Sequence, residues 1–180
     1  AFAGLRSAEI ERLNWVDLSF DESHIVIGKD KAKTASRRVV PIWDNCAEWL
    51  AQYQNLNGKI WRGSESNLHK TQRGIAKSAG VALKSNALRR SYASYRFAQT
   101  SDAGKVAGEM GNTAIIVHKH YRALVSAKAA EKWFSIRPDS ALKNVIKLNN
   151  TLMLHNGPLM IKFTSNIKCL IGNLMKLEIC

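Results

Sequence analysis

Residues 86–121 carry polar side chains of the types that phosphate chemistry requires. Arg89 and Asn112 can donate hydrogen bonds to phosphate oxygens, and the hydroxyl of Tyr121 can act as a nucleophile. Basic residues flank this tyrosine in the run KHYR. We therefore expect Arg89 and Tyr121 to face the same phosphate group. The alternative is that Tyr121 is a packed ring at the end of a helix with its hydroxyl in solvent.

Periodic patterning predicts the helices that position these side chains. The first is amphipathic, and it would bury an apolar row and leave Arg89 facing a shared cleft. The expected row is Leu88, Tyr92, Tyr95 and Ala98, set against Arg89, Arg90 and Arg96. The expected N-caps are Ser85 for this helix, Asp102 for one that stops at Gly111, Thr113 for one that leads into Tyr121, and Ser126 for a last helix that ends before Arg137.

The first half of the chain predicts a β-hairpin among short helices. The β-branched runs HIVIG (residues 24–28) and RVVPI (residues 38–42) are the expected strands, with Pro41 at an end or an edge. Residues 58–61 indicate a short strand or a turn.

Three helices are expected around this hairpin, and each is assigned a face or a cap. Residues 7–14 would turn Ile10 and Leu13 to one face, with Glu9 and Arg12 on the other. Residues 44–53 would turn Ala47, Leu50 and Ala51 inward, and Asn67 would cap a helix to Ala79. The tryptophans at 43, 49, 61 and 133 are expected to be core anchors rather than base-stacking platforms.

The charge balance indicates a polyanionic partner. The 180 residues include 27 Lys and Arg against 14 Asp and Glu, which gives a formal net charge of +13 and a pI of about 9.9. Such an excess is typical of proteins that bind nucleic acid. The alternative is a merely basic globular protein, with which a hydrophobic content of 46% also agrees.

Cysteine usage and hydropathy favour a cytoplasmic, nucleoid-associated protein without metal. The three cysteines, Cys46, Cys169 and Cys180, are scattered and form neither a metal-binding motif nor a disulfide framework. No secretory signal pattern opens the sequence, and Asn, Pro and Lys interrupt the apolar patches of the C-terminal part well short of a membrane span.

The composition changes after Pro138, which predicts one domain and a tail. Residues 139–180 have two acidic residues, many asparagines and no clear period. We expect residues 1–138 to form a domain that is incomplete at its N-terminus. Residues 139–180 would be a poorly specified basic tail, which we interpret as read-through of unselected sequence.

Four segments together resemble the catalytic domain of the tyrosine recombinase (phage integrase) family. GLRSAEIERLNWVD resembles the first box of that family, with Arg6 followed three positions later by Glu9. KTASRRVVP resembles the hairpin segment that carries a catalytic lysine, here Lys33. NALRRSYASY and MGNTAIIVHKHY resemble the second and third boxes, with Arg89 and the nucleophile Tyr121. The resemblance covers roughly residues 3–138.

The spacing of the boxes also resembles the family, but two residues depart from it. Asn112 follows Arg89 by 23 positions and precedes Tyr121 by nine, as in the family. Asn86 and Asn112 stand where the family usually has histidine. An amide can donate a hydrogen bond to a phosphate oxygen, but it cannot transfer a proton near neutral pH. These two departures predict a phosphate site that reacts slowly but is not inactive, since general acid–base catalysis is typically worth ~10²–10⁴-fold in rate.

The resemblance implies an α+β, mainly α fold: a helical catalytic domain with a small antiparallel sheet near its start. It implies site-specific recombination of double-stranded DNA through a 3′-phosphotyrosyl intermediate, without a cofactor, by a homo-oligomer on DNA. Arg6 and Arg89 would hold the phosphate oxygens, and Glu9 would hold the guanidinium of Arg6. Lys33 would protonate the leaving 5′ oxygen.

Each of these assignments has a plainer alternative. The arginines can be surface groups or ion-pair partners, and Glu9 can be an ordinary helix ion pair. Lys33 competes with Lys29 and Lys31, and the whole hairpin can be a basic loop that contacts the DNA backbone. For the whole chain, the alternatives are a catalytically inactive DNA-binding remnant of an integrase and an unrelated basic helical module.

Overall fold

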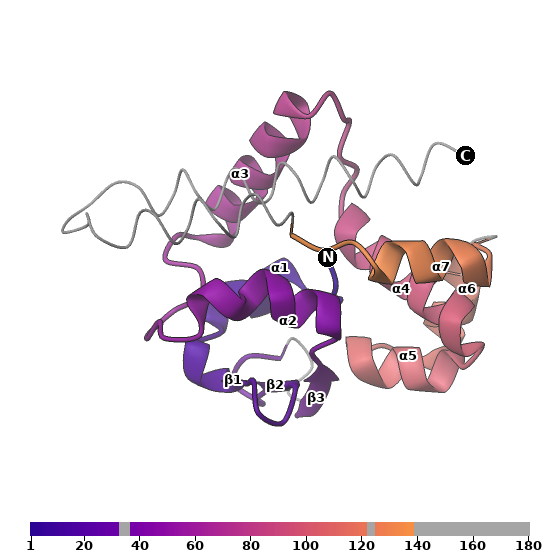
Figure 1. Cartoon of the computed structure of the whole chain (residues 1–180), viewed down its shortest axis with the longest axis horizontal. Helices are drawn as coiled ribbons and strands as arrows, with labels where there is room; N and C mark the ends of the chain where they lie inside the picture. Colours follow the sequence, from indigo (N-terminus) through magenta and orange to yellow (C-terminus); the bar gives the residue numbers. More distant parts are fainter. Residues whose placement is uncertain (33–36, 122–124, 139–180) are drawn as a thin grey trace.

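The computed structural model describes residues 1–32, 37–121 and 125–138. These residues form a mainly helical fold with one small antiparallel sheet (Figure 1). The expected class, α+β and mainly α, is therefore confirmed. The expectations for Lys33 and for residues 139–180 lie outside the described residues. No helix of the described part is long and apolar enough to cross a membrane.

The sheet has three strands in the order β1-β2-β3, and the expected hairpin forms its larger part. Strand β1 is Leu18–Ser19, β2 is His24–Ile27 and β3 is Arg38–Pro41. Ile25 pairs with Val40, and both are buried in the core. Pro41 pairs with His24 at the end of the ladder, which agrees with the position expected for a residue without an N–H donor.

The helices form two groups with the N-terminal segment between them (Figure 1). α1 and α2 lie beside the sheet, α4 to α7 form the second group, and α3 extends from the body. The bounds are α1 Ser7–Arg12, α2 Asp44–Leu50, α3 Glu65–Ser78, α4 Ala87–Thr100, α5 Ala103–Met110, α6 Ala114–Tyr121 and α7 Ala127–Phe134, with 3-10 helices at Trp15–Asp17 and Ala51–Tyr53.

One core joins the two groups, and aromatic side chains lie at its centre. Trp133 on α7 is fully buried and stacks on Tyr95 of α4 with ring centroids 5.1 Å apart. Phe2 meets Trp133 edge-on at 4.6 Å, so the start of the chain is part of this core. Trp49 and Trp61 are also buried, which confirms three of the four expected tryptophan anchors. Trp43 is half-buried beneath the guanidinium of Arg96.

The expected caps of the C-terminal helices are confirmed. The side chain of Asp102 accepts from the N–H of Lys105, and that of Ser126 accepts from the N–H of Ala129. Thr113 Oγ1 accepts from the N–H of Ile116 at 3.3 Å. Gly111 ends α5 at φ +65°, a conformation that glycine adopts without strain.

Two expected caps are wrong. Ser64, not Asn67, caps α3, and its hydroxyl accepts from the N–H of Asn67 at 3.3 Å. The expected cap was three residues late, because the apolar pattern begins only at Leu68. Asn86, not Ser85, precedes α4, and it has φ +56°. Asparagine tolerates this left-handed conformation better than serine does, which places the bend at residue 86.

Two expected faces are wrong because charged side chains are buried in pairs. Glu9 was expected opposite the apolar face of its helix, but it is buried beneath Arg6 and Arg38. Arg96 was expected outside, but it is buried and pairs with Glu109 at 2.9 Å. Hydrophobic periodicity assigns charged residues to the solvent-facing side of a helix, so it cannot predict pairs of charged residues that are buried together.

The expected face of α2 is confirmed only in part, since Ala47 and Leu50 are half-buried and pack against the core. Asn45, Cys46 and Trp49 are buried, whereas Ala51 is exposed. The large side chain of Trp49 decides the orientation against small alanines, since burial of apolar area scales with side-chain size. Ala51 lies in a 3-10 helix, where the angular step per residue differs and turns it out of the inward row.

Candidate functional site

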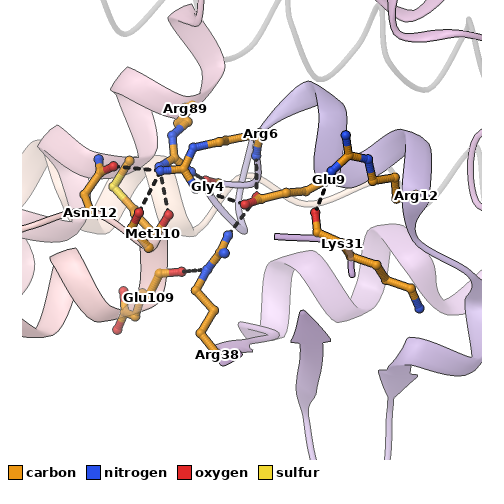
Figure 2. Close-up of polar contacts among 11 residues, drawn as sticks. Gly4, Arg6, Glu9, Arg12, Lys31, Arg38, Arg89, Glu109, Met110 and Asn112 are labelled. Atoms are coloured by element: carbon orange, nitrogen blue, oxygen red, sulfur yellow. Dashed lines mark hydrogen bonds and ion pairs between the residues drawn. The ribbon is translucent and has the colours of Figure 1, made fainter. Parts of the chain in front are cut away.

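The C-terminal end of α5 is the point on which three arginines converge (Figure 2). Three consecutive backbone carbonyls, which have no partner within the helix, each accept a hydrogen bond from a different guanidinium. Such a helix end carries partial negative charge, so it attracts and orients cations. The pairs are Arg38 Nε to Glu109 O at 3.2 Å, Arg89 Nη2 to Met110 O at 2.8 Å, and Arg6 Nη2 to Gly111 O at 2.7 Å.

The three arginines come from segments far apart in the sequence. Arg6 precedes α1, Arg38 opens β3, and Arg89 lies in the first turn of α4. Arg38 can pack this close to the end of α5 only because residue 111 is glycine. A Cβ there would lie 2.9 Å from Arg38 Nη1. The sheet, the N-terminal segment and the α4–α5 pair therefore all contribute to one site.

Glu9 holds two of these guanidiniums. Its Oε1 accepts from Arg6 Nη1 at 2.9 Å, and its Oε2 accepts from Arg38 Nη2 at 2.7 Å and from the backbone N–H of Arg6 at 2.8 Å. The side chain is 1% exposed. Burial alone would raise the pKa of Glu9, but the hydrogen bonds and charges of Arg38 and Arg6 outweigh it and lower the pKa. Glu9 is therefore ionised and fixed in place.

We expect Glu9→Gln to destabilise the fold by about 3 kcal/mol at neutral pH, because it leaves two half-buried guanidiniums without their carboxylate. The lowered pKa gives this difference a pH dependence. The contribution of Glu9 is complete above its ordinary pKa of 4.5 and is lost as the pH falls through its lower folded value. Urea unfolding of both proteins between pH 7 and pH 3 measures it. If the difference in unfolding free energy between the two proteins stayed constant below pH 4.5, the lowered pKa assigned to Glu9 would be contradicted.

Arg89 is the most confined of the three arginines. Arg89 is 8% exposed, and its Nη1 and Nη2 donate to Gly4 O and Met110 O. Burial and the nearby charge of Arg6 lower the pKa of Arg89 to about 10, and opposing contributions from Glu9 and Tyr121 do not restore it. The charged form of this guanidinium is therefore destabilised by its surroundings, and a bound anion would stabilise it.

The charges of the cluster do not balance. Arg6, Arg38 and Arg89 are opposed by the single carboxylate of Glu9. The carboxylate of Glu109 belongs to a separate network, where it accepts from Arg96 and from the hydroxyl of Tyr92. Among the described residues the site therefore has more guanidinium than carboxylate charge, which suits a phosphate ligand.

Asn112 joins the site through Arg6. Its Oδ1 accepts from Arg6 Nη2 at 2.9 Å, and its backbone N–H donates to Ala107 O. Because the amide oxygen faces the guanidinium, the amide nitrogen is the group that can donate to a ligand. The side chain can thus bind an anion, but it holds no proton that it could exchange near neutral pH.

Tyr121 lies within electrostatic reach of Arg89. It is the last residue of α6, it is half-buried against the core, and its charge raises the pKa of Arg89. Two of the other tyrosines are unsuited to attack a ligand, since Tyr92 and Tyr95 are buried. The remaining one, Tyr53, stacks on Trp15 with ring centroids 5.8 Å apart.

The structure brings together four of the expected site residues, Arg6, Glu9, Arg89 and Asn112, and places Tyr121 near them. Asn86 is exposed at the start of α4. It borders a cleft of about 590 Å³ that is also lined by Arg89, by Gly4 and by residues of α3. The expected role of Asn86 as a hydrogen-bond donor to the phosphate thus stays a prediction.

The hairpin contributes differently from what was expected. Lys31, a competitor for the role assigned to Lys33, donates to both carboxylate oxygens of Asp17 at 2.6 Å. It is therefore engaged in a local ion pair. Arg38 was overlooked as a site residue, although its place in the run RRVVP, three positions before Pro41, marked it as part of the hairpin segment.

Known proteins provide no assignment for this arrangement. Among the described residues, no three His, Cys, Asp or Glu side chains lie close enough together to hold a metal ion. Comparisons of the chain with protein-family models, with curated proteins and with solved structures found no match.

Proposed function

We propose that this chain is the catalytic part of a tyrosine recombinase, which cleaves and rejoins DNA strands through a 3′-phosphotyrosyl intermediate. The observation that carries the proposal is the arginine cluster at the end of α5. It holds Arg6 and Arg89 side by side with an excess of positive charge (Figure 2). Tyr121 lies within electrostatic reach of Arg89.

The cluster supplies what the transition state of phosphoryl transfer demands. Negative charge builds on the non-bridging oxygens of the phosphate, and preorganised donors in a water-poor site stabilise it without reorganising. Arg6 and Arg89 are preorganised by carbonyls, and Arg6 also by Glu9. Guanidiniums are suited to this task, because their planar forks match phosphate oxygens.

Tyr121 is the nucleophile of the proposed step. Its hydroxyl proton passes to solvent water as its oxygen forms a bond to phosphorus. The bond from phosphorus to the 5′ oxygen breaks, and the 5′ oxygen leaves as a hydroxyl after gaining a proton. Lys33 is the proton donor that the resemblance suggests. The ester stores the energy of the broken bond, so a 5′ hydroxyl can later reverse the step without a cofactor.

Double-stranded DNA is the proposed substrate. Its backbone provides phosphodiesters for the cluster, and the net charge of +13 favours association with such a polyanion. Binding should therefore weaken steeply as salt rises. The cleft beside Arg89, bordered by Asn86 and α3, is the proposed path of the strand toward the cluster.

Covalent trapping tests the proposal. A nicked suicide duplex loses a short fragment after cleavage, so the phosphotyrosyl product accumulates. We expect the protein, incubated with a pool of such duplexes of random sequence, to form an adduct that survives denaturation. Tyr121→Phe should abolish the adduct and leave DNA affinity unchanged, because it removes only the attacking oxygen.

The result that would contradict catalysis is salt-sensitive DNA binding without any adduct. It would favour the second candidate, an inactive DNA-binding remnant. One observation supports that candidate: Asn112 can orient Arg6 but cannot exchange a proton. Tyr92→Phe is unsuitable as the control, since Tyr92 donates to Glu109. Tyr53→Phe is better, because Tyr53 stacks on Trp15 and lies in a 3-10 helix that contributes no residue to the arginine cluster.

A further inference from the structure

Arg38 links the two groups that hold Arg6 in place, the carboxylate of Glu9 and the C-terminal end of α5. Its Nη2 donates to Glu9 Oε2 at 2.7 Å, and its Nε donates to Glu109 O at 3.2 Å. Glu9 in turn accepts from Arg6 Nη1, and the C-cap of α5 offers Gly111 O to Arg6 Nη2. Both supports of Arg6 are thus tied to one guanidinium (Figure 2).

We propose that Arg38 is a positioning residue of the phosphate site, which fixes Glu9 and the end of α5 where they orient Arg6. This inference rests on the proposed function for the reaction that it serves, but the positioning itself is a property of the free protein. Arg38 acts through Arg6 and is assigned no contact with DNA.

The planar fork of Arg38 is what the position requires. Two nitrogens of one rigid plane reach a carboxylate on one side and a backbone carbonyl on the other. The guanidinium also packs over Gly111, where a Cβ would lie within 2.9 Å of its Nη1. The arginine therefore links a side chain of α1 to the C-terminal end of α5.

Loss of this link should affect catalysis more than binding. Arg6 would keep its charge, but its guanidinium would no longer be held in one orientation. Misplacement of a catalytic group by about 1 Å can cost ~10²-fold in rate. Attraction of DNA depends mainly on net charge, so it should fall only as much as for the loss of any one arginine.

The test compares Arg38→Met with Arg37→Met. Arg37 is the adjacent residue, is exposed, and gives the same change in charge. Two readouts are used for each protein. The first is the NMR signals of the Arg6 side chain in the DNA-free protein, where a held guanidinium shows resolved Nη protons. The second is the adduct rate at saturating nicked duplex, together with the DNA dissociation constant.

We expect Arg38→Met to lose the resolved Arg6 signals and to cleave ~10²-fold more slowly than Arg37→Met at similar DNA affinity. Arg38→Lys should restore part of the rate, because one ammonium can reach Glu9 or the carbonyl but cannot span both. In an Arg6→Ala background, Arg38→Met should cost little further rate, since a residue that acts through Arg6 has nothing left to position.

Unchanged Arg6 signals and a rate equal to that of Arg37→Met would overturn the inference. If Arg38→Met does not fold, Arg38→Lys carries the test, and wild-type signals and rate in that variant would overturn it. If the wild type forms no adduct while Arg38→Met still loses the Arg6 signals, the positioning role stands and the proposed reaction fails.

Discussion

Arg89→Lys is expected to lower the rate of DNA cleavage by roughly 10²–10³-fold, the usual cost of removing one preorganised donor to a developing oxyanion. Arg89 donates through Nη1 to Gly4 O and through Nη2 to Met110 O. A guanidinium has five N–H donors in one plane, and we expect the remaining ones to meet the phosphate. A lysine has one nitrogen and cannot reproduce that geometry. Single-turnover cleavage of a nicked duplex measures the loss.

The same variant should acquire a distinctive pH profile. Burial and Arg6 lower the pKa of Arg89 to about 10, which leaves the arginine charged at neutral pH. The same surroundings acting on a lysine, whose ordinary pKa is about 10.4, would draw its pKa toward neutrality. We therefore expect the residual rate of Arg89→Lys to rise as the pH is lowered from 9 to 7. A flat profile would contradict the assigned environment.

Arg90→Lys is the matched control for that experiment. Arg90 is the next residue on α4 and is exposed. Its replacement changes neither the net charge nor the cluster, so it should leave the rate within about twofold of the wild type. An equal loss in both variants would mean that Arg89 contributes no more than a surface cation.

Asn112→His is expected to raise the cleavage rate by about 10²-fold. Asn112 Oδ1 accepts from Arg6 Nη2, and one ring nitrogen of a neutral histidine can accept in the same place. The other nitrogen could then donate to the phosphate and exchange its proton near neutral pH, a contribution typically worth ~10²–10⁴-fold. The rate should also acquire a dependence on pH around about 6.5.

Asn112→Gln is the control that separates proton transfer from hydrogen bonding. It keeps the amide but lengthens the side chain, so it should not raise the rate. A histidine variant that cleaves no faster than the wild type would show that proton transfer at residue 112 is not what limits the site.

The sequence allowed the elements of the second helical group to be predicted well. Capping residues such as Asp102 and Ser126, and the glycine at 111, mark helix ends by local chemistry, and each was found where expected. The hairpin was predictable for the same reason, since runs of β-branched residues favour the extended conformation of a strand. Local signals of this kind need no knowledge of the partners in space.

The interior position of charged groups was not predictable. Glu9 and Arg96 are buried because they find partners 29 and 13 residues away, in Arg38 and Glu109. Periodicity contains no information about such pairs. The motif spacing did indicate that Arg6, Arg89 and Asn112 belong to one site, but it could not show that the carbonyls at the end of α5 hold the two arginines in place.

Identification of the amino acid that is joined to DNA tests the central claim most directly. The trapped adduct would be digested with nuclease and protease, and the nucleotide-bearing peptide sequenced by mass spectrometry. Of the four tyrosines in the chain, we predict that Tyr121 alone carries a 3′-phosphate of the cleaved strand. Linkage to another residue, linkage through a 5′-phosphate, or an adduct that persists in Tyr121→Phe would contradict the account.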